Sequence, residues 1–255
     1  MWTPSCFTKC YLYCLDSITN VEAMELMILM FFLWAVIYVW IQRKFQTQSA
    51  EWVSRVLAMC HSIVITKLAE LTFVFGDWPL DNFGETNTKW YTFLVSCSAG
   101  YFLFETLWCL YMNSEGIMML LHHFLSLSAL FSSLYFNVSG AEAIYGLLVT
   151  EATNPFLQVR WFLRDAGLHK TVFAAVNECV FAALFGYFRF VLATILVGKM
   201  LITPKCGLTF KIGGVGLYII SILWMVFIVK MVQKKVNLLR KGKLTYEDDL
   251  SRLKS

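Results

Sequence analysis

The sequence predicts an all-α fold, namely a multi-pass transmembrane helical bundle of about seven helices. Of its 255 residues, 58% are hydrophobic and only 15% are charged, and the mean hydropathy is +0.63. A soluble domain carries about 25% charged residues, so most of this surface faces something other than water. The net charge of +4 comes from basic residues at segment ends. Nucleic-acid binding needs a clustered basic patch, so we expect no nucleic-acid partner.

Seven apolar segments approach the length of about 20 residues that a helix needs to cross a bilayer. They lie near residues 24–41, 53–75, 91–112, 117–136, 142–162, 172–198 and 212–232. The predicted membrane domain therefore covers residues 24–232. An N-terminal segment, 1–23, precedes it, and a basic and mixed tail, 233–255, follows it.

Basic residues in the short loops predict the orientation, because Lys and Arg favour the cytosolic side. They cluster after the first, fifth and seventh spans, at Arg43 and Lys44, at Arg164 and Lys170, and in the segment from Lys234. With seven spans, these loops share one side, so the C-terminus is predicted to be cytosolic and the N-terminus lumenal or outside. The sequence leaves the compartment open among the endoplasmic reticulum, another endomembrane and the plasma membrane.

A few ionisable residues lie inside the predicted spans, where such residues are costly and mark function or pairing. Counting from the cytosolic end of each span places polar groups of five spans in one layer, about 8–16 Å deep. Glu178 and Arg189 stand behind the principal members. These principal members are His61, Glu105, His122, His123, Glu151, Asn154 and Arg160.

The adjacent pair His122 and His123 is the sharpest local feature. Neighbouring helix positions differ by about 100°, so one ring can face a cavity while the other packs against a neighbour. An imidazole can transfer a proton or act as a nucleophile toward an activated acyl group. The alternative is a structural pair that hydrogen-bonds across helices.

The segment Glu151-Ala-Thr-Asn154-Pro155 is predicted to form a proline kink. Glu151 and Asn154 share a helix face and would form one wall of a lipid-headgroup pocket. A hydrogen-bonded packing kink is the alternative. Arg160 is predicted either to receive a phosphate or to extend to the membrane interface.

Three cysteines near the start, Cys6, Cys10 and Cys14, follow an i, i+4, i+8 spacing. No histidine accompanies them, which argues against zinc, and no metal site is expected. Palmitoylation, a disulfide and no special role all remain open.

Four stretches resemble the TLC domain of the TRAM–LAG–CLN homology superfamily, and the resemblance covers about residues 50–232. They read EWVSRVLAMCHS from Glu51, GYFLFETLWCLYMNSEGIMMLLHHFLSL from Gly100, TEATNPFLQVRWFLRDAG from Thr150 and GGVGLYIISILW from Gly213. The sequence is most similar to the TLC domain-containing protein 5 subgroup.

The resemblance implies a lipid-accessible central cavity and a role in lipid metabolism or homeostasis, with membrane phospholipids or sphingolipids as partners. In ceramide synthases a histidine pair in this position transfers an acyl group from acyl-CoA, so His122 and His123 become catalytic candidates and acyl-CoA a candidate co-substrate. The aspartates that follow that pair in ceramide synthases are replaced here by Glu142 and Glu151.

We therefore expect histidine-dependent acyl transfer, supported by the other polar residues of the layer: His61, Glu105, Glu151, Asn154 and Arg160. Two alternatives stay open. The first is a non-catalytic lipid-binding protein or a regulator of membrane composition. The second is a seven-helix receptor, which the sequence favours less because Asn154-Pro155 falls in the fifth span and not near the end. The sequence does not specify the oligomeric state.

Overall fold

The computed structural model describes residues 19–76 and 81–241. The predictions for Cys6, Cys10 and Cys14, and for the end of the tail from residue 242, lie outside these residues. Within the described ranges the secondary structure is helical, apart from a single bridge between Thr86 and Val138. The predicted all-α class is thereby confirmed.

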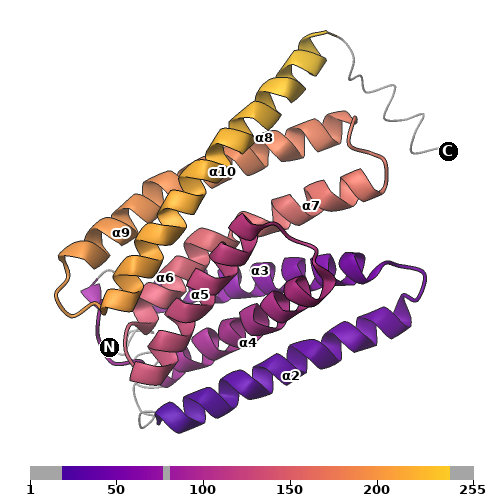
Figure 1. The fold of residues 1–255 in the computed structure, drawn as a ribbon. Coiled ribbons are helices and arrows are strands. Elements are labelled where there is room, and N and C mark those ends of the chain that lie inside the picture. Colours follow the sequence, from indigo (N-terminus) through magenta and orange to yellow (C-terminus); the bar gives the residue numbers. More distant parts are fainter. Residues whose placement is uncertain (1–18, 77–80, 242–255) are drawn as a thin grey trace, which may run out of the picture.

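The helices follow one another along the chain with short connections (Figure 1). They are α2 (Asn20–Lys44), α3 (Ala50–Phe75), α4 (Lys89–Met112), α5 (Ile117–Phe136), α6 (Gly140–Glu151), α7 (Asn154–Asp165), α8 (Val172–Gly186), the π-helix η2 (Tyr187–Leu192), α9 (Ala193–Ile202) and α10 (Leu208–Arg240). Six helical segments among the described residues are long and apolar enough to cross a membrane, with α8, η2 and α9 counted as one.

The fifth predicted span, 142–162, is not one kinked helix but two helices of 12 residues, α6 and α7. Pro155 lies in the first turn of α7 and has no N–H to donate. Its ring also clashes with the carbonyl of the residue four positions earlier, Glu151, at which α6 ends. The helix is therefore interrupted at Ala152 and Thr153. Together the two halves complete seven passes.

Most helices begin earlier than hydropathy predicts, because polar caps lie outside the apolar runs. Thr19 forms a capping box with Glu22 at the start of α2. The side chains of Ser49, Thr88 and Thr171 accept hydrogen bonds from the first turns of α3, α4 and α8. A predicted start at residue 24 thus becomes a helix from residue 20.

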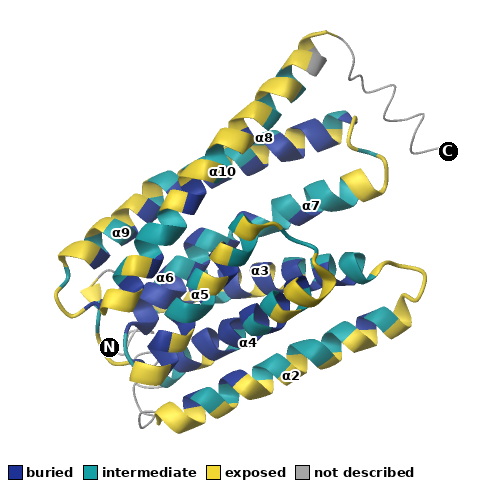
Figure 2. Ribbon diagram, viewed as in Figure 1, coloured by how far each residue is buried: buried dark blue, intermediate teal, exposed yellow. Residues whose placement is uncertain are grey.

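Burial divides the bundle into an inner and an outer set of helices (Figure 2). Of the 18 consecutive residues that are most apolar in each helix, 61% are buried in α4 but only 11% in α2. Large apolar side chains such as Phe32 and Val36 are exposed on α2. An outward apolar face of this kind suits contact with lipid, so α2 is a peripheral helix that packs on α4.

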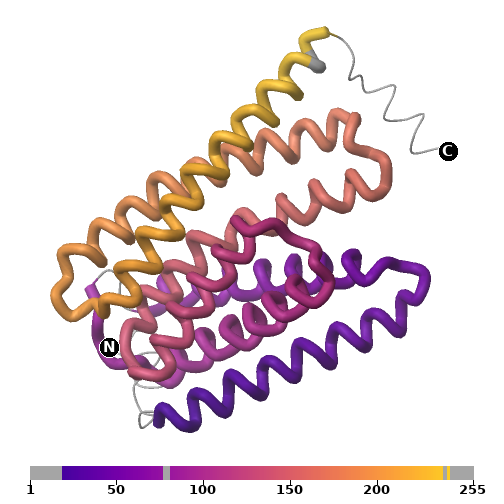
Figure 3. Tube along the Cα trace, in the orientation of Figure 1, coloured from indigo at the N-terminus to yellow at the C-terminus, as the bar shows by residue number. Residues whose placement is uncertain are grey.

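The three loops that carry the predicted basic clusters lie at the same end of the bundle (Figures 1 and 3). These are the end of α2, the turn between α7 and α8, and the end of α10. The arrangement agrees with the predicted alternation of seven passes. The cytosolic assignment of this end remains a prediction.

Candidate functional site

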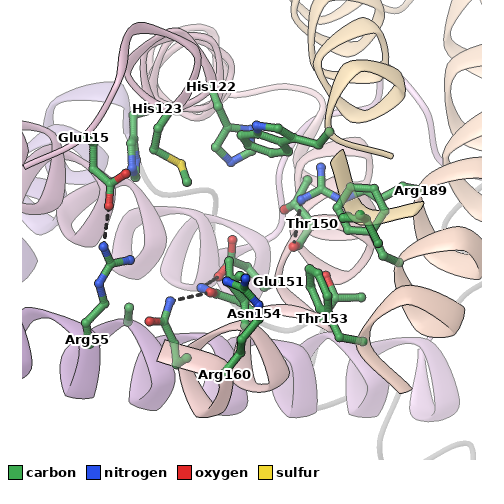
Figure 4. A pocket seen from close by; sticks show the side chains of 18 of the residues that line it. Arg55, Glu115, His122, His123, Thr150, Glu151, Thr153, Asn154, Arg160 and Arg189 are labelled. Atoms are coloured by element: carbon green, nitrogen blue, oxygen red, sulfur yellow. Dashed lines mark hydrogen bonds and ion pairs between the residues drawn. The ribbon is translucent and has the colours of Figure 1, made fainter. Parts of the chain in front are cut away.

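A cavity with a volume of about 320 Å³ lies between the helices α3 to α8, the π-helix η2 and α10 (Figure 4). One side of it is apolar, with aromatic and aliphatic side chains from α8 and α10. The other sides are polar. The polar and charged lining consists of Arg55, Glu105, Glu115, His122, His123, Thr150, Glu151, Thr153, Asn154, Gln158, Arg160 and Arg189. Six of the seven principal residues predicted from the sequence are therefore brought together here.

The seventh predicted residue, His61, lies behind the cavity wall and contacts Glu151. Its Nδ1 is 3.6 Å from Glu151 Oε2, a distance that suits an ion pair of a protonated ring but exceeds a hydrogen bond. Its Nε2 is 3.3 Å from Ser98 Oγ, and the ring stacks on Tyr101 with centroids 3.9 Å apart. His61 therefore contacts the Glu151 carboxylate from behind the cavity wall.

His122 and His123 project from α5 on one side of the cavity, facing Glu151, Asn154 and Arg160 on the opposite side (Figure 4). Their ring centroids are 5.8 Å apart. Both side chains are buried and line the cavity, and both rings also pack on aromatic neighbours. In the described part of the chain, Nδ1 of each ring has no hydrogen-bond partner. Buried polar atoms are rarely left unsatisfied, so these nitrogens are suited to meet a ligand.

Aromatic side chains fix the orientation of the two rings. His122 packs against Trp224 of α10 with centroids 5.1 Å apart. His123 packs against Phe102 of α4 at 5.8 Å. Aromatic residues of α4 and α10 thus hold the histidine pair of α5 through apolar contacts, and Nδ1 of each ring stays without a hydrogen-bond partner among the described residues.

Two arginines at the basic end of the cavity are held in ion pairs. Arg55 Nη2 lies 2.6 Å from Glu115 and 3.1 Å from Glu51. Arg160 Nε donates to Glu178 at 3.2 Å. Glu178 also lies 3.5 Å from Lys235, so one carboxylate is shared by two cations. Arg160 lines the cavity, and the prediction that it receives a phosphate or extends to the interface stays a prediction.

The sequence that forms this cavity matches a known family. A model of the TLC domain matches residues 44–230, more than half of the chain. The chain belongs to the TLC domain family. Among its curated relatives, TLC domain-containing protein 4 A of Dictyostelium discoideum is 23% identical over 223 residues, which cover 79% of this chain and 86% of the relative. TLC proteins are in general membrane proteins of lipid metabolism or homeostasis, whereas the subgroup 5 assignment stays a prediction.

Three charged groups of this TLC domain were not among the principal residues that sequence reasoning selected. Arg55 and Glu115 are sixty positions apart in sequence and meet at the cavity. Arg189 lies in the π-helix and lines the far side. Two features of the sequence could have indicated these residues. One is the i, i+4 spacing of Glu51 and Arg55, and the other is the charge of Arg189 within the sixth predicted span. Neither signal shows which partner, if any, each arginine contacts.

Glu105 completes the polar lining of the TLC cavity without a cation. Ser54 Oγ lies 3.1 Å and 3.2 Å from its two carboxylate oxygens. No Lys, Arg or His of the described chain lies within 4 Å of it. Within residues 19–76 and 81–241, no three His, Cys, Asp or Glu side chains gather closely enough to hold a metal ion. The polar groups present therefore offer proton transfer, nucleophilic attack and hydrogen bonding.

Proposed function

We propose that this TLC protein acts on membrane lipids as a histidine-dependent acyltransferase, with acyl-CoA as the acyl donor. One observation carries the proposal. Two adjacent buried histidines line a cavity of the membrane domain, and Nδ1 of each ring lacks a partner in the described chain. An imidazole nitrogen without a hydrogen-bond partner can act as a nucleophile or a base toward a substrate that enters the cavity.

The reaction proceeds in two balanced steps. First, an imidazole nitrogen of His122 or His123 attacks the thioester carbonyl, a C–N bond forms, the C–S bond breaks, and CoA leaves with the proton as its thiol. Second, a lipid hydroxyl or amine attacks the acyl-imidazole, a C–O or C–N bond forms, and the acyl–imidazole bond breaks. The second histidine accepts the proton of the attacking group and passes it to the released imidazole nitrogen, so both rings end the cycle neutral. The aromatic neighbours position the pair, and the polar residues of the opposite wall would position the acceptor lipid.

The acceptor lipid would contact the wall opposite the histidines. Asn154 and Glu151 lie there, joined by a hydrogen bond of 3.2 Å, and Gln158 Nε2 donates to Asn154 Oδ1 at 2.7 Å. Amide and carboxylate groups of this kind recognise hydroxyl and amine groups. We therefore assign headgroup positioning to this wall, supported by Glu105 and Arg160.

The test compares purified wild-type protein with the double variant His122→Ala, His123→Ala in vesicles of mixed phospholipids and sphingoid bases. Radiolabelled palmitoyl-CoA supplies the acyl group, and untargeted lipidomics identifies the product. The matched control is His169→Ala, because the His169 side chain lies outside the cavity lining and is exposed. We expect product with the wild type and the control but none with the double variant. Full activity of the double variant would refute catalysis by the pair.

A second candidate function is non-catalytic lipid binding or regulation of membrane composition. One observation favours it: in the described chain no carboxylate lies within 4 Å of His122 or His123, whereas His61 does have Glu151 nearby. Catalytic histidines are commonly oriented by such an acid. In this case, mass spectrometry would find a lipid bound to the purified protein, and palmitoyl-CoA would not be consumed.

A further inference from the structure

Arg189 is a cavity cation that makes no ion pair within the described chain, although its guanidinium lies 5.5 Å from the centre of the Phe185 ring. Its side chain is buried, yet no carboxylate of the described residues lies within 4 Å of it. Arg55 and Arg160, which line the same cavity, both have carboxylate partners. Burying an arginine without an anionic partner costs free energy. The Arg189 guanidinium is therefore suited to bind an anion from outside the chain.

The guanidinium uses few of its donors within the protein. Nη2 donates to the Thr150 carbonyl at 3.0 Å, and Nη1 donates to Ser221 Oγ at 3.4 Å. Nε has no partner among the described residues. A guanidinium has five N–H donors in a planar fork that matches the two oxygens of an anion. The two existing contacts hold the fork in place and leave donors for a ligand.

The backbone around Arg189 is arranged to present it inward. It is the single buried residue of the π-helix Tyr187–Leu192. Single π-turns in α-helices occur frequently at functional sites, because the extra residue changes which side chain faces the interior. Figure 4 shows Arg189 beside Thr150 at the cavity, across from Arg55.

The nearest acidic residue in sequence to the Thr150 contact is Glu151, but its carboxylate is directed elsewhere. Glu151 Oε2 accepts from Asn154 at 3.2 Å and lies 3.6 Å from His61. These partners belong to α7 and α3, whereas Arg189 belongs to the segment between α8 and α9. Glu151 therefore makes no ion pair or hydrogen bond with Arg189, although its carboxylate is close enough to act on the guanidinium electrostatically.

An apolar wall leads away from Arg189 toward the basic end of the bundle. On α10 it follows the i, i+3, i+4, i+7 positions of one helix face, and α8 adds two phenylalanines. Seven residues of helix correspond to about 10 Å, enough for a good part of an extended alkyl chain. The wall consists of Phe181, Phe185, Trp224, Phe227, Ile228 and Met231.

We propose that Arg189 binds the carboxylate of a long-chain fatty acid, whose alkyl chain lies along this wall of α8 and α10. A guanidinium with free donors and no carboxylate of the described chain in direct contact matches a headgroup with a single negative charge and two oxygens. The subsite rests on the proposed lipid-binding role of the cavity, but it does not require chemistry at the histidines.

The first test uses the wild-type protein in nonionic detergent and the fluorescent fatty acid cis-parinaric acid as the probe. Palmitate should displace the probe about tenfold more effectively than 1-hexadecanol, which has the same chain without the charge. Equal displacement would overturn the proposal. Tighter binding of lysophosphatidic acid than of palmitate would overturn the carboxylate assignment, because the site would then select a phosphate.

The second test uses variants of the arginine. Arg189→Gln should weaken palmitate about tenfold or more, whereas Arg189→Lys keeps the charge and should lose less. Arg164→Gln is the matched control, since Arg164 is exposed and lies outside the cavity. Unchanged affinity in folded Arg189→Gln protein would refute the subsite. If that variant does not fold, the wild-type comparison decides.

The two proposals fail separately. Loss of discrimination between palmitate and 1-hexadecanol removes the Arg189 subsite while acyl transfer from palmitoyl-CoA continues. Conversely, acyl transfer by the double histidine variant removes the catalytic proposal while selective palmitate binding persists.

Discussion

Asn154 donates a hydrogen bond of 3.2 Å to Glu151 across the interruption between α6 and α7. The two backbone halves of the fifth pass are thereby joined by side chains where the helical hydrogen bonds are lost. Gln158 donates to Asn154 at 2.7 Å and extends the contact along α7. A buried polar chain of this kind stabilises the interruption only when its members are satisfied.

Asn154→Ala is expected to destabilise the fold by about 1–3 kcal/mol, because it removes the hydrogen bonds of Asn154 to Glu151 and Gln158 and leaves Glu151, among the described residues, only its contact with His61. Thermal unfolding in detergent measures the change as a lower midpoint. Asn237→Ala is the matched control, since Asn237 is an exposed residue of α10. An equal midpoint for both variants would show that the bridge does not stabilise the interruption.

Gly100 allows α4 to approach α2 closely. A Cβ atom at this position would lie 2.7 Å from Phe31 N and 2.9 Å from Met27 O, both of which are backbone atoms that cannot rotate away. Gly100→Ala is therefore expected to separate the helices and cost about 1–3 kcal/mol, seen as a lower unfolding midpoint.

The control for Gly100 is Gly146→Ala in α6, where an added Cβ would meet nothing within 4 Å. Alanine is favoured over glycine inside a helix by about 1 kcal/mol, so this variant should be neutral or stabilised. A midpoint for Gly100→Ala at or above the wild-type value would contradict close packing of α2 on α4.

How far the sequence predicts this structure depends on whether the signal is local. The apolar runs locate the spans because about 20 apolar residues suffice to cross a bilayer. The polar layer also follows from the sequence, since depth within a span is a matter of counting residues. By contrast, hydropathy treats residues 142–162 as continuous, although Pro155 interrupts the helix at Glu151.

Side-chain partners were beyond sequence reasoning, because they depend on how each helix is rotated about its axis. Arg160 and Arg189 are both arginines within apolar segments. The structure pairs Arg160 with Glu178 but brings no carboxylate of the described chain within 4 Å of Arg189. The π-helix at Tyr187–Leu192 shifts the helical register by part of a turn. No sequence motif in this segment predicts a π-helix.

Cys206 should remain an unreactive thiol while the protein is folded. It lies in the connection between α9 and α10, where burial raises its pKa to about 12 and neighbouring Glu142 adds to the effect. The reactive thiolate is therefore scarce at pH 8. Maleimide labelling at that pH, followed by peptide mass spectrometry, should modify Cys206 only after unfolding in SDS. Equally rapid labelling of the native protein would show that the connection is open.

The half-buried pair of Arg55 and Glu115 should couple more strongly than an exposed pair. Both side chains are 19% exposed and their charged atoms are 2.6 Å apart. A double-mutant cycle with Arg55→Gln and Glu115→Gln should give about 1 kcal/mol or more, because water screens the pair incompletely.

Lys67 and Glu70 supply the comparison for that cycle, since they form an equally short ion pair of 2.7 Å with side chains 68% and 41% exposed. The same cycle on this pair should give about 0.5 kcal/mol or less. The Arg55 pair joins α3 to the connection that precedes the histidine helix α5. Similar coupling energies for the two pairs would mean that the ion pair does not hold this connection over the cavity. A larger coupling energy for Arg55 and Glu115 would mean that this ion pair helps to hold the cavity lining next to His123.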